Sequence, residues 1–122
     1  MSNLLRPSPA APRVYLCVAP VDFRKSITGL SLLVEQSLGL NPFDVTLYVF
    51  INRRRDKIKI LLWEKNGFVL WYKRLEKQRF KWPAGVDTPT LTLNGEQLNW
   101  LLDGFDLWRN QPHQSLSFSS VG

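Results

Sequence analysis

The residues with the clearest capacity for chemistry in this sequence are cations gathered into one segment. Residues 52–81 carry eleven lysines and arginines and three carboxylates, whereas residues 1–51 have a net charge of +1 and residues 82–122 a net charge of −3. Such cations neutralise phosphates and release counterions, so this concentration of charge indicates a binding site for nucleic acid or another polyanion. A surface that only keeps the protein soluble is the alternative, although such a surface usually mixes its signs.

Candidates for covalent or metal-dependent catalysis are few. The single cysteine, Cys17, lies in an apolar run, which predicts a buried, inert thiol in a reducing compartment. The single histidine, His113, lies in a polar C-terminal stretch, so no base is expected beside the thiol. The sequence contains no GxxxxGK loop, GxSxG elbow, CxxC pair or HExxH helix, and its ten carboxylates are scattered. We therefore expect no catalytic residue, no metal, no cofactor and no small-molecule substrate.

Hydrophobic periodicity and turn residues divide the chain into strands and helices. Asp22 is a candidate cap for the first helix, and Asn94 with Gln97 forms a candidate capping box for the second. The second helix is expected to turn Leu98, Leu101, Leu102 and Phe105 inward. The predicted elements, in chain order, are a strand at 13–19, a helix at 22–38, strands at 45–51, 57–64, 68–77 and 91–93, and a helix at 94–104. This order predicts an α+β fold, with an antiparallel β-sheet, a central Asn-Gly hairpin and two helices packed on one face. The single domain is expected at residues 13–108, between a flexible leader at 1–12 and a flexible polar tail at 109–122.

The hairpin is predicted from Asn66-Gly67, which stands between two apolar runs and tolerates the positive φ of a two-residue turn. With these residues as the turn, Leu62 faces Trp71 across the strands. The face expected to meet the core is apolar apart from one misfit, and it carries Ile58, Ile60, Leu62, Val69, Trp71, Lys73 and Leu75. The face expected to be outward carries Lys57, Lys59, Leu61 and Trp63 opposite Glu76, Arg74, Tyr72 and Leu70. A slip of one residue in the register would exchange the two faces.

The outward face alternates cations with aromatic rings and follows a turn of three arginines. Cations can hold phosphates while rings stack on bases, and a basic β-ribbon can also lie in a duplex groove. Trp63 and Tyr72 are the candidate stacking residues, unless the second helix covers them and leaves only the cations exposed. The predicted nucleic-acid-binding residues are Arg53, Arg54, Arg55, Lys57, Lys59, Trp63, Tyr72, Arg74, Lys77 and Arg79.

Three stretches of the sequence are similar to one known family. They read VYLCVAPVDFRKSITGL at 14–30, NPFDVTLYVFINRRRDKIKILLWEKNGF at 41–68 and LWYKRLEKQRFKWP at 70–83. Their most specific pieces are the Asp-x-Arg-Lys at 22–25, the Asn-Arg-Arg-Arg-Asp-Lys turn and the Tyr-Lys-Arg-Leu-Glu run. The chain thus resembles, over residues 13–107, the TnpB-type or Orf2-like accessory protein of the insertion-sequence-66 class of bacterial transposons. It does not resemble the larger RNA-guided nucleases that share the TnpB name.

The resemblance implies a non-catalytic accessory protein that assists a separate, larger transposase. It brings no catalytic residues to this sequence. The expected partners are DNA, either transposon ends or any sequence, together with the transposase and other proteins of the same element. The alternative is an interaction module that docks an acidic surface of the transposase without contacting DNA. Since no run approaches 18 apolar residues, no membrane association is expected, and the predicted location is the cytoplasm.

Overall fold

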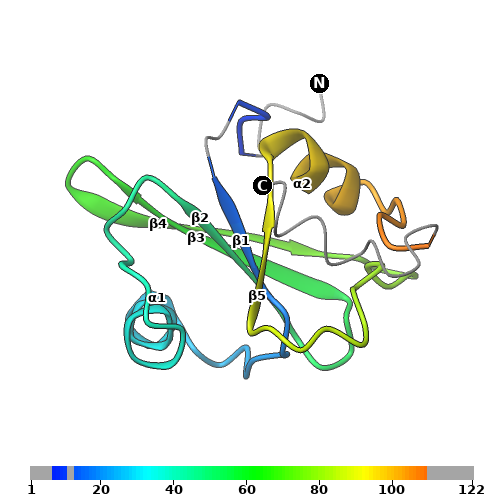
Figure 1. Ribbon diagram of the computed structural model, residues 1–122, viewed down its shortest axis with the longest axis horizontal. Helices are drawn as coiled ribbons and strands as arrows, with labels where there is room; N and C mark the ends of the chain where they lie inside the picture. The colour runs from blue at the N-terminus through cyan, green and yellow to red at the C-terminus, as the bar shows by residue number, and fades with distance from the viewer. Residues whose placement is uncertain (1–6, 11–12, 110–122) are drawn as a thin grey trace.

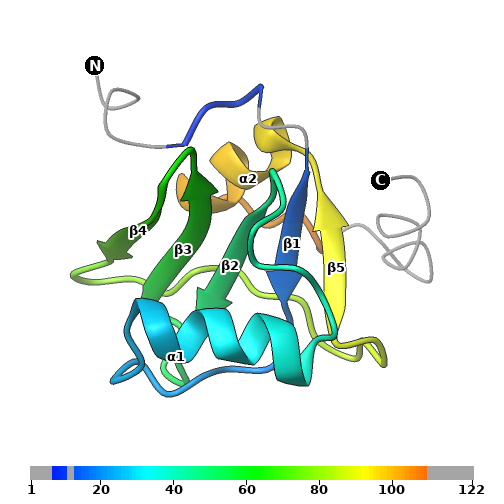
Figure 2. The ribbon, with the colours of Figure 1, turned by 90° about the vertical axis from the view of Figure 1, so that its left-hand side faces the viewer.

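Five strands form one sheet in the computed structural model, which describes residues 7–10 and 13–109. The strands are β1 (Val14–Cys17), β2 (Leu47–Ile51), β3 (Lys57–Glu64), β4 (Gly67–Arg74) and β5 (Thr90–Leu93). They lie side by side in the order β4-β3-β2-β1-β5 (Figure 2). β1 and β2 run parallel, and every other neighbouring pair is antiparallel. The chain therefore folds as the predicted single α+β domain, with one parallel pair in a mostly antiparallel sheet.

Helical segments follow β1 and β5. They are α1 (Ile27–Leu32), its π-helical continuation η2 (Leu33–Ser37) and α2 (Gly95–Leu102). α2 begins where it was predicted, because the side chains of Asn94 and Gln97 each accept the backbone N–H of the other. α1 begins later than predicted. Asp22 accepts the Arg24 N–H in a turn (2.9 Å), and Ser26 occupies the N-cap position of the helix.

The two helices cover opposite faces of the sheet, so the expectation that both pack on one face is wrong (Figures 1 and 2). On one face, Leu30 and Val34 of α1 and η2 join a buried cluster. On the other, Leu98 and Leu101 of α2 join a larger cluster. β2 supplies both clusters with alternate side chains, which explains why its whole sequence, LYVFI, is apolar and buried. α1 lies in the crossover between the parallel strands, whereas α2 follows an edge strand, and no local pattern decides which face either takes.

β3 and β4 form the predicted hairpin, but at an edge of the sheet and not at its centre. The turn residues are Lys65 and Asn66, one position earlier than predicted, and Lys65 has the positive φ, 54°. Leu62 consequently faces Val69, two residues away from the expected Trp71. A shift of two residues returns every side chain to its original face, so the predicted division of the hairpin into two faces is confirmed.

The face predicted to be outward is in fact partly covered. Leu61 at its centre is fully buried in the cluster beneath α1, and Lys57 and Lys59 are half-buried. The opposite face contains the misfit Lys73, whose Nζ donates to the Leu102 carbonyl oxygen (3.0 Å). That oxygen lies at the C-terminal end of α2, where the helix dipole favours a cation. The lysine therefore has a structural role in the core-facing surface.

The end of α2 departs from the prediction at one residue. Leu98, Leu101 and Leu102 are buried as expected, but Phe105 is exposed, because the chain leaves the helix at Gly104, where φ is 95°. Most of the predicted leader and tail, with His113, lies outside the described residues. None of the helices formed by residues 7–10 and 13–109 combines the length and the hydropathy of a membrane span.

Candidate nucleic-acid interface

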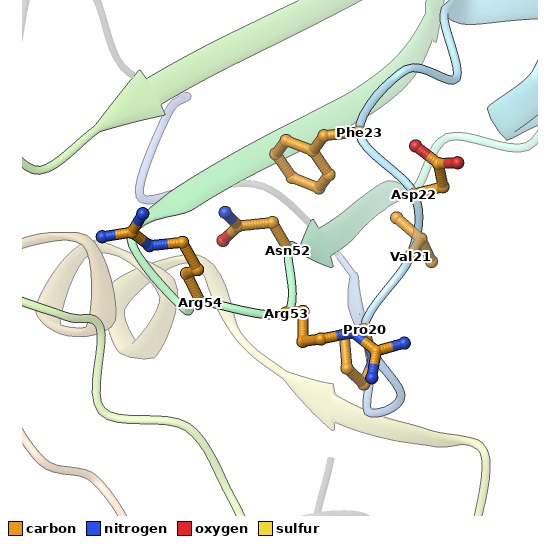
Figure 3. Close-up of a pocket in the computed structure, with 7 residues that line it drawn as sticks. All are labelled: Pro20, Val21, Asp22, Phe23, Asn52, Arg53 and Arg54. Carbon is orange, nitrogen blue, oxygen red and sulfur yellow. The ribbon is translucent and has the colours of Figure 1, made fainter.

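A groove opens where the segment after β1 passes the turn between β2 and β3. The Val21 N–H donates to the Ile51 carbonyl oxygen (2.9 Å) and ties that segment to the end of β2. One hollow, of about 390 Å³, is shown in Figure 3 and is lined by Pro20, Val21, Asp22, Phe23, Asn52, Arg53 and Arg54. A second hollow, of about 660 Å³, is lined by Asp22, Phe23, Arg24, Lys57, Lys59 and Tyr72. Because the two share Asp22 and Phe23, we treat them as one surface, the basic groove.

The arginine turn (residues 53–55) is held in shape by the side chain of Asn52. Its Oδ1 accepts the N–H groups of Asp56 (3.1 Å) and Lys57 (3.0 Å), and its Nδ2 donates to the Asp56 carboxylate (2.6 Å). The last of these bonds is the main reason that the pKa of Asp56 lies below its usual value. All three arginines are exposed, and no carboxylate in the described part of the chain forms an ion pair with them. Their guanidinium groups are therefore available to an anionic ligand.

Lys59, predicted to contact phosphate, is a positioning residue in the structure. Its Nζ donates to the carbonyl oxygens of Phe23 and Lys25, both at 2.8 Å, and lies 5.0 Å from the centre of the Phe23 ring. These contacts attach the segment after β1 to the middle of β3 and hold the Phe23 ring at the groove. A phosphate contact by Lys59 would compete with them.

Asp22 and Arg24 form an exposed ion pair at the rim of the groove. The Arg24 Nη2 donates to Asp22 Oδ2 (2.6 Å), and its Nε lies within hydrogen-bond distance of both carboxylate oxygens. The side-chain hydrogen bonds from Arg24 are the largest cause of a pKa of about 2 for Asp22. The carboxylate thus stays charged at neutral pH and offsets one cation of the groove.

The other predicted cations lie at the end of β4 and beyond it. The Arg74 Nε donates to the exposed Glu76 carboxylate (2.9 Å). Lys77 and Arg79 are exposed on the segment that follows. This segment returns to the arginine turn, where the Phe80 N–H donates to a carbonyl oxygen of the turn (2.7 Å). The basic surface therefore continues from the groove around the end of the sheet.

Trp63 lies apart from the basic groove. It is six residues along β3 from Lys57, which corresponds to about 20 Å in an extended strand. Its ring packs edge-on against Phe43 and Phe68, with both pairs of ring centres 5.0 Å apart. Of the two candidate stacking residues, only Tyr72 lies in the basic groove together with the cations.

The structure brings five of the predicted residues to the groove: Arg53, Arg54, Lys57, Lys59 and Tyr72. It adds Phe23 and Arg24, which the sequence interpretation missed. Both belong to the Asp-x-Arg-Lys stretch that supports the family resemblance, and this stretch was the available signal. It was overlooked because those residues were assigned to the start of a helix, whereas they form a loop that folds onto β3.

Groups suited to covalent or metal chemistry are not gathered at this groove. Burial raises the pKa of the Cys17 thiol to about 11, so the thiol is protonated at neutral pH. Within the residues that the structure describes, no three His, Cys, Asp or Glu side chains are grouped so that they could hold a metal ion. What the groove offers is mainly positive charge and aromatic surface, which suit the binding of an anionic ligand.

The fold and the groove define this protein as a small α+β domain with a cationic, partly aromatic groove. The model of the family described as IS66 Orf2 like protein matches residues 12–112, and the chain belongs to this family, an accessory family associated with transposition. It is 34% identical to the "uncharacterized protein y4hO" of Sinorhizobium fredii, over 95% of this chain and 98% of that one. It is 32% identical to "uncharacterized protein y4jC" of the same organism, over 80% and 82% of the two chains. No solved structure matches the chain.

Proposed function

We propose that the protein is a non-catalytic accessory factor of DNA transposition that binds DNA through the basic groove and the arginine turn and assists a separate transposase. Membership of the IS66 Orf2-like family supports the role in transposition. The distribution of charge supports contact with DNA, either at the transposon ends or without sequence preference. On this proposal the protein acts in the cytoplasm, where bacterial DNA lies.

The observation that carries the proposal is the availability of the arginine turn. Its three side chains are exposed and form no ion pair with the described carboxylates. Asn52 maintains the turn, so binding a ligand need not disturb the fold. A guanidinium group can make two parallel hydrogen bonds to one phosphate, and Lys57 at the start of β3 adds a neighbouring charge.

The test is a double substitution, Arg53→Ser with Arg54→Ser. Arg55 is left unchanged because its φ is 64°, a left-handed conformation that serine adopts poorly. Exposed positions of this kind rarely affect stability, so the free energy of unfolding should stay within about 0.5 kcal/mol of the wild type. Duplex binding, measured by fluorescence anisotropy at several salt concentrations, should weaken, and the slope of log K against log salt should shrink by up to about 0.9 per lost contact.

The matched control is Arg13→Ser with Arg109→Ser, which removes the same charge from exposed positions that do not line the groove. An equal change of slope in both variants would mean that net charge alone drives binding. An unchanged slope in a folded Arg53 and Arg54 variant would contradict the proposal. If the wild type shows no salt-dependent binding to DNA while the same variant loses binding to the transposase, the basic surface docks the transposase instead.

A further inference from the structure

We propose that the basic groove takes the unpaired bases of single-stranded nucleic acid, with one base stacked on Tyr72. This inference rests on the proposed function, because it names the form of nucleic acid that the same groove would bind. It follows from what covers the hairpin, from the position of one aromatic ring and from the arrangement of cations around it.

The hairpin cannot enter a duplex groove as a free β-ribbon. β3 is an interior strand, paired with β2 on one side and β4 on the other. The two helices lie on opposite faces of the sheet (Figures 1 and 2). Buried side chains cluster on both faces of β3, with Ile58 and Ile60 on one and Leu61 on the other. A ribbon that reads base edges needs an open face to lay in the groove of the duplex. Nucleic acid must therefore bind in the basic groove of the protein, because the hairpin cannot insert into a groove of the duplex.

Tyr72 supplies a surface for stacking inside that groove. Its side chain is 50% exposed, and its ring centre lies 6.5 Å from that of Phe23 at an angle of 55°. Phe23 is itself held by the contacts of Lys59. The tyrosine ring thus has a fixed neighbour and remains half open to a ligand. Exposed rings among cations are what proteins use to hold single strands, since every base has a face that can stack.

Cations line both hollows of the groove and can neutralise the phosphates of a bound strand. Lys57 lines the same hollow as Tyr72, together with Arg24, whose charge is partly offset by Asp22. Arg53 and Arg54, which form no ion pair with a described carboxylate, line the adjoining hollow. The volume of the hollow beside Tyr72, about 660 Å³, is in the range in which proteins hold small organic ligands, and a nucleotide is of that class. Inside a duplex, both faces of each base are stacked on its neighbours, whereas an unpaired base can place its face on this ring.

The experiment compares three labelled DNA probes by fluorescence anisotropy with the full chain. The first is a single strand of about 20 nucleotides, which exceeds the roughly 4–16 nucleotides covered by one OB fold of a single-strand-binding protein. The second is the same sequence as a blunt duplex, and the third is that duplex with a single-stranded overhang. The wild type should bind the single strand and the overhang at least about tenfold more tightly than the blunt duplex. Tyr72→Ala should weaken single-strand binding by about 5- to 150-fold, the cost of one lost stacking contact, and leave duplex binding unchanged.

Two further variants separate stacking from folding. Tyr72→Phe keeps the ring and should keep the preference, whereas Tyr72→Leu keeps apolar bulk against Phe23 and should lose it. Phe105→Ala is the matched control, because Phe105 is at least as exposed as Tyr72 (60%) but lies outside the groove, and it should leave binding to all three probes unchanged.

Each outcome bears on one of the two proposals. Salt-dependent duplex binding with no preference for single strands, unaffected by Tyr72→Ala or Tyr72→Leu, overturns this inference and leaves the proposed function standing. Binding to no probe overturns both. An equal loss in Tyr72→Ala and Phe105→Ala would also overturn the inference, because the loss could then not be assigned to the ring of Tyr72.

Discussion

Replacing Asn52 with alanine tests whether one side chain shapes the arginine turn. Asn52 is 8% exposed and makes three hydrogen bonds with its amide group. Two of them satisfy backbone N–H groups, worth about 1 kcal/mol each, and the third meets a charged carboxylate, worth about 1.5–3 kcal/mol. Their sum predicts that Asn52→Ala lowers the free energy of unfolding by about 3.5–5 kcal/mol. That is a large share of the roughly 5–15 kcal/mol that stabilises an ordinary domain.

Urea unfolding followed by circular dichroism measures the effect. The midpoint should fall while the dependence on urea concentration stays the same, because the surface exposed on unfolding does not change. In urea-free buffer, the fraction that remains folded should also bind DNA less tightly, although no charge has been removed. The arginine turn would then be free to leave its conformation, and binding would have to restore it.

Asn41→Ala is the matched control. Asn41 is exposed, and its Oδ1 accepts the Phe43 N–H (3.0 Å) in the loop before β2. Because water can replace that bond, the cost should be below about 1 kcal/mol. If Asn52→Ala costs no more than Asn41→Ala, the reasoning that buried amide bonds hold the turn is refuted.

Three further substitutions test other parts of the structure. Asp22→Asn keeps the oxygen that accepts the Arg24 N–H but removes the negative charge that offsets Arg24. DNA binding in about 0.1 M salt should therefore tighten by up to about eightfold, the effect of one more cationic contact, and weaker binding would contradict this. Lys73→Met removes the hydrogen bond to Leu102 and should cost about 1–2 kcal/mol in urea unfolding; an equally stable variant would exclude a capping role. Trp71→Ala removes a half-buried ring that packs on the cluster beneath α2 and should cost about 3 kcal/mol; an unchanged midpoint would place the ring outside the core.

Local interactions determined much of this fold, and the sequence alone revealed them. The capping box of Asn94 and Gln97 forms within one helical turn, so it needs no knowledge of the rest of the chain. β3 spans the predicted residues 57–64, because its alternation of apolar side chains with others reflects the geometry of an extended strand. The predicted hairpin register is wrong by two residues, but the predicted assignment of side chains to its two faces is confirmed, because side chains alternate with a period of two.

The sequence also determined that positive charge is concentrated in one segment, but the tertiary structure decided which residues form the groove. Phe23 is held on β3 by Lys59, which binds the loop after β1 in a contact between residues 36 positions apart. Tyr72 and Trp63 look alike in the sequence, on one face of one hairpin. Phe43 closes over Trp63, while Tyr72 stays half open beside the cations. Periodicity specifies the side of a strand on which a residue points, whereas the segment that covers it depends on contacts between distant parts of the chain.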